Sequence, residues 1–290
     1  MHLRLLLIAL AVFGCKQGDD AAGKRATAPD LQLVSAGNEP RQVLRYHAAK
    51  GTKQQLEIAV DVEVGAGEMG GPMPTIVMTL AIEVEAVLPT GMKLRTSVVD
   101  AVARDRDETK VPTNALSGPL DLMKGIVITS TMTQSGRLFG TKLDTGSKPI
   151  PATAKTQLAA LSASFDQLMM PLPEAPVGVG AVWRNSKPLE QNGMKMTAVN
   201  SIELVSVVGD KLTYNIDTEV HGDDQTVKYG DLSVEIKDIT GKGTGKGTID
   251  LATLGLTSQL ESNFRSQMQA PGEGSATQMT MGIVTKVTPK

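Results

Sequence analysis

Long runs in which apolar residues recur at every second position constrain the fold of this chain more than any other feature of its sequence. Residues 54–64 and 75–85 each carry an aliphatic or methionine side chain at every second position. This period-two alternation is typical of β-strands that bury one face and expose the other. The connection between the two runs, residues 65–74, is rich in glycine and proline, so we expect a long hairpin.

The same alternation returns along most of the remaining chain. Turn sequences at 89–91, 134–136, 209–210 and 250–255 separate the runs. We expect further strands near 92–102, 126–132, 138–143, 181–183 onward, 194–208, 212–220, 232–239, 248–250, 256–268 and 277–287. The sequence therefore predicts a mainly β (α+β) fold built on an antiparallel sheet.

Two segments break the alternation and are candidates for helices that cover the sheet. Thr153–Met170 carries one apolar stripe at helical spacing, and Pro171 follows it as a stop. Asn114–Lys124 fits a shorter helix, weakened by Gly118 and Pro119. One or two helices provide little cover for so many strands, so we expect a strongly curved, half-barrel-like sheet. Closure of the sheet and sandwich packing remain open as alternatives.

The first fifteen residues carry a targeting signal. His2 and Arg4 precede an apolar run of about ten residues, which is too short to span a bilayer. The run ends in Gly14 and Cys15, the only cysteine of the chain, and this order is similar to a bacterial lipobox. We therefore expect residues 1–14 to be a lipoprotein signal peptide and Cys15 to be lipidated. The alternative is an ordinary signal peptide that is cleaved elsewhere.

The region after the cysteine predicts how the folded part is attached. Residues 15–40 are rich in glycine, alanine, aspartate and lysine with little apolar periodicity, so we expect a flexible tether. Residues 41–290 are expected to form a single β-rich domain. Several acyl chains on Cys15 would anchor it stably to a bacterial membrane. Lys16 favours the outer membrane over the inner one, so the expected location is the cell envelope.

The charge of the chain argues against a nucleic acid partner, and its composition limits which residue types can fill the core. Lys and Arg total 29 against 31 Asp and Glu, evenly interspersed, for a net charge of −2. No basic stripe is present, so we expect no nucleic acid partner. Aromatic residues make up only 3 % of the chain while methionine reaches 14 residues, so aliphatic side chains and methionine must fill the core.

Residues 241–248, Gly-Lys-Gly-Thr-Gly-Lys-Gly-Thr, superficially resemble a phosphate-binding loop. That loop requires a first glycine where Thr240 stands and a hydroxyl residue where Gly247 stands. The pattern is better explained by a strand in which glycines allow the sheet to bend.

No group of residues predicts catalysis or a metal site. The pairs Met194/Met196 and Met279/Met281 have a spacing used for copper(I), but they fall in phase with the apolar face and are expected to fill the core. His221 precedes two aspartates without a ligand spacing, and His47 stands alone. The sequence contains no G-x-S-x-G motif, so it does not predict the nucleophile elbow of a hydrolase. We expect no enzyme, no catalytic or metal-binding residue and no cofactor.

The segment Pro173–Trp183 is the most distinctive local signature of the chain. It follows the order P-x-x-P-V-x-V-G-x-x-W and resembles an uncharacterised family of bacterial lipoproteins, known only as a domain of unknown function. The resemblance extends over 44–287 and implies a fold without catalytic residues, and we expect Trp183 to anchor the core. The pattern of long strands is also similar to the open half-barrels of Lol-type lipoprotein carriers, at the level of the fold only.

Together these patterns predict a membrane-anchored cell-envelope lipoprotein without enzymatic activity. We expect it to hold a lipid or another apolar ligand on the concave face of the sheet, beneath the Thr153–Met170 helix. The alternative is a structural or protein-binding envelope module with a filled core. An envelope enzyme is the third option. The sequence names no protein partner.

Overall fold

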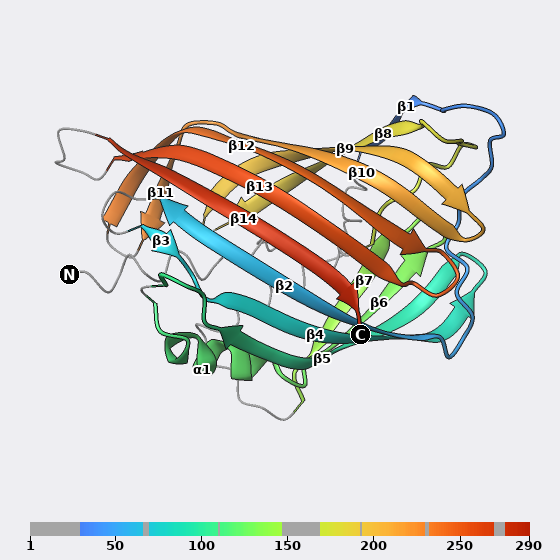
Figure 1. The fold of residues 1–290 in the computed structure, drawn as a ribbon, viewed down its shortest axis with the longest axis horizontal. Coiled ribbons are helices and arrows are strands. Elements are labelled where there is room, and N and C mark those ends of the chain that lie inside the picture. Colours follow the sequence, from blue (N-terminus) through green and yellow to red (C-terminus); the bar gives the residue numbers. More distant parts are fainter. Residues whose placement is uncertain are drawn as a thin grey trace.

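The structure, a computed structural model, describes residues 30–65, 70–109, 111–146, 169–191, 193–229, 232–269 and 276–290. Within these residues the chain forms one helix and many strands, drawn in Figure 1. The elements are β1 (Asp30–Ser35), β2 (Lys53–Gly65), β3 (Gly71–Pro72), β4 (Thr75–Leu88), β5 (Gly91–Arg104), α1 (Asn114–Met123), β6 (Val127–Thr133), β7 (Leu138–Asp144), β8 (Val182–Gln191), β9 (Met194–Val208), β10 (Lys211–Gly222), β11 (Gln225–Tyr229), β12 (Leu232–Asp250), β13 (Leu256–Gln269) and β14 (Thr277–Pro289).

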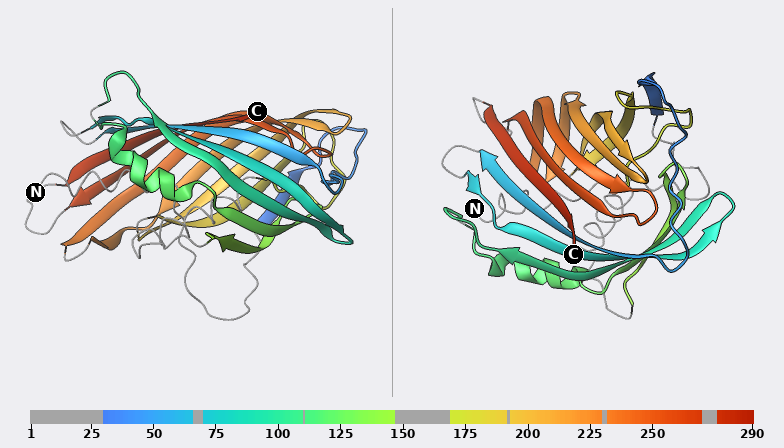
Figure 2. Two further views of the ribbon diagram at one scale, coloured as in Figure 1. Left: turned by 90° about the horizontal axis from the view of Figure 1, so that it is seen from below. Right: turned by 45° about the vertical axis from the view of Figure 1, so that its right-hand side comes forward.

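The strands of the described residues form one antiparallel sheet. Its order is β1-β8-β9-β10-β12-β13-β14-β2-β4-β5-β6-β7, with β11 paired to β12 and β3 paired to β2. Two meanders make up this order, β8–β14 and β2–β7, and the pair β14–β2 joins them, as Figures 1 and 2 show. The end strands β1 and β7 do not pair with each other, so the sheet is open. The predicted mainly β, antiparallel fold is confirmed.

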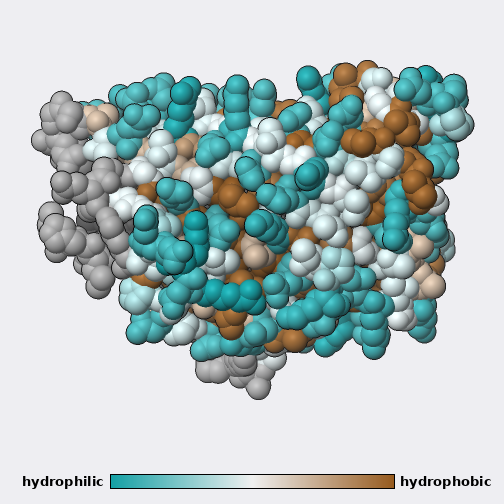
Figure 3. Space-filling model, viewed as in Figure 1, coloured by the Kyte–Doolittle hydropathy of each residue, from teal (hydrophilic) through white to brown (hydrophobic). Residues whose placement is uncertain are grey.

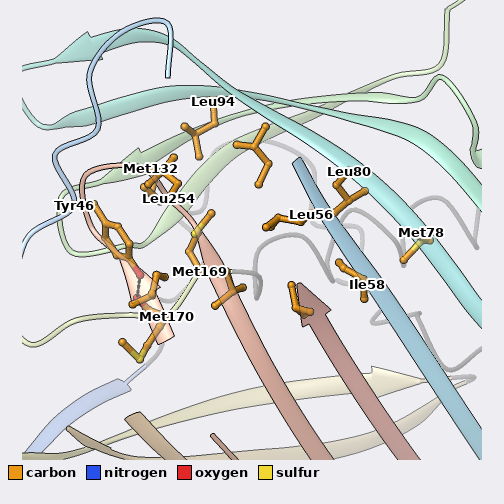
Figure 4. Close-up of a cluster of buried hydrophobic side chains, with 14 of the residues drawn as sticks. Tyr46, Leu56, Ile58, Met78, Leu80, Leu94, Met132, Met169, Met170 and Leu254 are labelled. Carbon is orange, nitrogen blue, oxygen red and sulfur yellow. Dashed lines mark hydrogen bonds between the residues drawn. The ribbon is translucent and has the colours of Figure 1, made fainter. Parts of the chain in front are cut away.

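The alternation of the sequence decides which face of the sheet is buried. Leu56 on β2, Leu204 on β9 and Leu212 on β10 are fully buried, and we call the face that carries them the inner face. The opposite face of β12 and β13 carries exposed polar residues such as Lys242 and Glu261. In Figure 4, Leu56 and Ile58 of β2 lie beside Met78 and Leu80 of β4 within the core. Strand periodicity therefore separates core from surface as expected.

A segment between β1 and β2, residues 36–51, crosses one end of the sheet and is called the strap here. Its backbone N–H groups donate to carbonyls of distant elements: Asn38 to Val179 at 2.8 Å, Tyr46 to Gln134 at 2.8 Å, His47 to Leu251 at 3.0 Å and Gly51 to Val84 at 2.8 Å. The strap thus connects the region before β8 with the β6–β7 turn, the β12–β13 turn and β4. These hydrogen bonds hold the strap in place even though it belongs to no regular element.

Part of the predicted tether is a strand. Asp30–Ser35 forms β1 and pairs antiparallel with β8, and the strap then continues without a break to β2. The reason is local alternation: Leu31 and Leu33 are half-buried and pack against the main core. The expectation of a flexible segment up to residue 40 is therefore wrong for 30–40. The signal peptide, Cys15 and the rest of the tether lie outside the described residues.

The helix predictions have separate outcomes. The shorter candidate is confirmed as α1, which buries Leu116 and Leu120, one turn apart, and packs against β5 despite Pro119 within it. The longer candidate, Thr153–Met170, lies outside the described residues except for Met169 and Met170. Both of these methionines are buried in the main core.

Candidate functional site

The inner face divides into a closed part and a part that solvent reaches. Leu204 and Leu212 are 0 % exposed, and Ile202 and Val220 are 2 % exposed, whereas other apolar side chains of β10 and of the neighbouring strands β13 and β14 are only half-buried. We call these the half-exposed patch, and its members are Ile216 on β10, Leu260 and Phe264 on β13, and Met281 and Ile283 on β14. Strand register places them side by side, since Gly245 of β12 pairs with both Ile216 and Leu260, and Phe264 pairs with Met281.

Glycines of β12 form the centre of this region. Gly241 and Gly247 lie on the inner face, where aromatic rings of the neighbouring strands cover them. A Cβ atom built on Gly247 would lie 2.6 Å from the hydroxyl oxygen of Tyr214, and one built on Gly241 would lie 2.5 Å from Cδ1 of Phe264. The glycines therefore give the rings room to lie flat against the strand.

Residues 241–248 do not form a phosphate-binding loop. They lie inside β12 and pair with β10 on one side and β13 on the other. Their backbone N–H groups take part in the sheet, whereas a phosphate-binding loop directs such groups at the anion in front of a helix. The interpretation as a glycine-containing strand is confirmed.

A row of polar side chains crosses the inner face at right angles to the strands. Asn185 of β8 pairs with Asn200 of β9, Asn200 with Thr218 of β10, Thr218 with Gly243 of β12, and Gly243 with Ser262 of β13. The hydroxyl of Thr218 donates to Oδ1 of Asn200 at 2.8 Å. We call these residues the polar row. It lies next to the half-exposed patch, because Ser262 pairs with Ile283.

Asn185 is the most unusual member of the polar row. Asn185 is 1 % exposed, and among the described residues its Oδ1 accepts no hydrogen bond. Such an atom is unusual, because buried polar atoms nearly always have a hydrogen-bond partner. Sequence analysis missed the row, although a signal exists. Asn185 follows Trp183 by two residues and thus occupies the core phase of its strand, and Thr218 does the same between Ile216 and Val220.

Two buried tyrosines, Tyr214 of β10 and Tyr46 of the strap, are neutral. Burial raises the pKa of the Tyr214 phenol to about 12. Burial also raises the pKa of Tyr46 far above its usual range, against the opposing effect of the 2.9 Å hydrogen bond that its hydroxyl donates to the carbonyl of Met170. Both side chains are neutral at physiological pH, and neither pKa is adjusted toward proton transfer near neutrality.

The predicted core anchor is confirmed. Trp183 is 0 % exposed, and its indole Nε1–H donates to the carbonyl of Pro171 at 2.9 Å. The preceding glycines are structural too, since a Cβ on Gly178 would collide with the carbonyl oxygen of Asn38 in the strap. The Pro173–Trp183 signature therefore encodes the contact between the strap and the start of β8.

The methionine pairs pack as apolar side chains. Met194 and Met196 lie with Met268 against a small second core around Ile236 and Ile239, at the far end of β12. Met281 packs against the main core. These methionines therefore lie partly buried at the margin of the two cores, in phase with the apolar face, which agrees with the adaptable shape of the methionine side chain.

His47 and His221 lie at the surface, each beside a carboxylate. Nε2 of His47 is 3.3 Å from Asp210, and Nε2 of His221 is 3.9 Å from Glu219, with all four side chains more than half exposed. Over the described ranges, no group of three or more histidine, cysteine, aspartate or glutamate side chains is arranged to hold a metal ion. In that same part of the chain, no helix is long and apolar enough to cross a membrane.

Comparison with known protein families matches part of the chain. A family of unknown function, DUF6263, matches residues 154–255, which include β8 to β12 and thus most of the polar row. The match supports the expected similarity to an uncharacterised domain, over a shorter range than 44–287. No curated protein matches the chain.

Proposed function

We propose that this protein is a lipid-anchored cell-envelope protein that binds an apolar ligand on the inner face of its sheet without catalysing a reaction. The observation that carries this proposal is the half-exposed patch. Apolar side chains that solvent reaches on the core side of a sheet mark a surface available to a ligand. Methionine and branched aliphatic side chains suit a flexible acyl chain, because they adapt to its shape.

The arrangement of the core supports a strongly curved, half-barrel-like sheet as the framework of this site. One hydrophobic cluster contains Leu80 and Met132 from the β2–β7 meander together with Leu204 and Leu212 from the β8–β14 meander. Side chains of both meanders can share one core when the sheet bends around it, and the right-hand view of Figure 2 is consistent with such a bend. In this proposal α1 and the Thr153–Met170 segment supply the cover.

The anchor is proposed from the sequence. Cys15 follows a signal-like leader, and fourteen residues, 16–29, separate it from the start of β1. At roughly 3.5 Å per residue, such a segment reaches at most about 50 Å from the membrane. The folded part would therefore stay close to the bilayer that supplies or receives an apolar ligand.

A specific surface feature favours the second candidate, a protein-binding envelope module. Exposed valines gather where β1, β8 and β9 meet the end of the sheet, and Figure 3 shows hydrophobic surface in that region, at the upper right. Val34 is 52 % exposed, Val179 45 % and Val205 40 %. Backbone hydrogen bonds place Val179 next to both the strap and β9, since Gly180 N–H donates to the carbonyl of Leu204.

Titration with a fluorescent fatty-acid analogue tests the proposed function. We expect saturable binding by the wild type and binding weaker by about tenfold or more in Leu260→Glu, because the new carboxylate would be desolvated by an apolar ligand. Gln259→Glu adds the same charge to the adjacent, outward-facing position of β13 and should leave binding unchanged. Circular dichroism checks that both variants fold. Absence of saturable binding by the wild type would favour the protein-binding module.

Fractionation of cells tests the anchor separately. Cys15→Ser should move the protein from the membrane to the soluble fraction, since the acceptor thiol for lipid is gone. Membrane association of this variant with normal removal of the leader would contradict lipidation.

A further inference from the structure

The polar row gives the proposed ligand site a chemical preference. We propose that Asn185, Asn200 and Thr218 bind the hydroxyl group of an uncharged amphiphile, such as a long-chain alcohol or an acylglycerol, whose chain lies on the half-exposed patch. This inference rests on the proposed function and adds the class of ligand to it.

In the described part of the chain, the polar row lacks a hydrogen-bond donor for the buried amide oxygen of Asn185. A buried amide oxygen without a partner accepts a hydrogen bond readily from any donor that reaches it, because no competing interaction must be broken. Oδ1 of Asn185 is such an atom among the described residues. A hydroxyl or amide N–H of a ligand supplies the missing donor. An ether oxygen or an ionised carboxylate supplies none.

The polar row itself holds two amides and two hydroxyls and no charged side chain. The inner-face rows on either side of it are Ile202, Ile216, Gly245 and Leu260 on one side, and Lys187, Ala198, Val220, Gly241 and Phe264 on the other. A charged head group seated on the row would lose its hydration without gaining a charged partner within the row. The row therefore favours an uncharged head group, and a carboxylate would instead have to reach Lys187 of β8, which already takes part in an interaction.

Asn200 and Thr218 are half-buried, whereas Asn185 at the end of the row is buried. A ligand hydroxyl that approaches along the row meets the Thr218–Asn200 pair first and Asn185 last. Binding at Asn185 requires side chains around it to change rotamer, which is common when ligands and partners bind.

The position of the row suits a molecule with a polar end and an apolar chain. Ser262 pairs with Ile283, and Phe264 with Met281 is the next pair on the same face. A chain that leaves the polar row toward β14 thus runs directly over the half-exposed patch. The hydrogen-bonding group fixes the orientation of the ligand, and the patch provides most of the buried area.

Three probes of matched length test the proposal: decanol, decyl methyl ether and decanoate, each used to displace the fluorescent fatty-acid analogue from the wild-type protein. We expect decanol to bind about tenfold more tightly than the ether and decanoate, since only decanol donates a hydrogen bond at neutral pH. Asn185→Leu should bring decanol to the affinity of the ether. Asn215→Leu, an asparagine on the outer face of β10, is the matched control and should leave the ratio unchanged.

The outcomes separate this inference from the proposed function. If no probe binds saturably, the proposed function itself is wrong. Equal affinities of decanol and the ether, or tighter binding of decanoate, would overturn the inference while leaving apolar binding intact. An unchanged decanol preference in Asn185→Leu would also overturn it and assign Asn185 a structural role. Thr218→Val, which keeps the side-chain shape, provides a second test if Asn185→Leu fails to fold, and it should reduce the same preference.

Discussion

Replacement of Gly247 by alanine tests whether the glycine-rich segment is a packed strand. A Cβ atom at this position would lie 2.6 Å from the hydroxyl oxygen of Tyr214 and 2.6 Å from the carbonyl oxygen of Thr257. The second contact is with backbone of the paired strand β13, so it cannot be relieved by a side-chain rotation. Tyr214 is only 7 % exposed, and its ring would lose buried contacts if it moved away. Both effects oppose the substitution.

The expected loss follows from two opposing contributions. Overpacking in a dense core costs about 1–3 kcal/mol. Alanine returns about 0.4–1 kcal/mol, because it restricts the unfolded chain more than glycine does. The net loss of stability is therefore about 1–2 kcal/mol, which lowers the melting temperature of a chain of this size by roughly 2–8 °C.

Thermal unfolding followed by circular dichroism measures this loss, with urea unfolding as a second assay. Gly118→Ala is the matched control, because no atom among the described residues crowds a Cβ on Gly118 and the residue lies inside α1. This control should gain about 0.5–1 kcal/mol from higher helix propensity. A Gly247→Ala protein at least as stable as the wild type would refute the close packing of Tyr214 on β12.

Three further predictions concern the core and the N-terminal region. Trp183→Phe should lower the free energy of unfolding by about 1–3 kcal/mol in urea titrations, since the buried carbonyl of Pro171 loses its donor. The free energy of unfolding should fall as pH rises from about 10 to about 12, because the pKa of Tyr214 is 10.0 in the unfolded chain and about 12 in the folded one. Tyr214→Phe should reduce that fall by up to about 3 kcal/mol and leave the contribution of Tyr46. The same loss of stability in Tyr214→Phe as in the wild type would contradict this prediction. Trypsin should cut at Lys24 and Arg25 and leave β1 with the core, so protection of these two sites would contradict the tether prediction.

Strand positions could be predicted from the sequence where apolar residues alternate over many positions. β2 and β13 show this, and their inward and outward residues are as the period-two pattern indicates. β4 departs from the pattern, because Val77 and Thr79 at its expected outward positions are buried as well. The sequence predicts two separate strands at 232–239 and 248–250, whereas β12 is continuous from Leu232 to Asp250. Its inner positions between 241 and 247 are glycines, which carry no hydrophobic signal even though they keep the inward phase.

Short edge strands are harder to predict. β1 presents only Leu31 and Leu33 to the core, which is too little alternation to distinguish it from the polar sequence around it. Its formation depends on the free edge of β8, more than 140 residues further along the chain. The local sequence contains no information about the free edge of β8. It therefore predicts a flexible tether for residues that form a strand because β8 pairs with them.

The candidate site depends even more on register. Asn185, Asn200, Thr218 and Ser262 each look like a single polar interruption of an apolar phase, and such interruptions are common in strands. Only the pairing of five successive strands aligns them into one row. If the row were a tolerated defect, its members would be expected to satisfy one another, as the half-buried Thr218 and Asn200 do. Asn185 stands next to Asn200 in register and still leaves its oxygen unpaired among the described residues. A buried acceptor kept without a partner, beside apolar side chains that solvent reaches, is what a site for a donor-bearing apolar ligand requires.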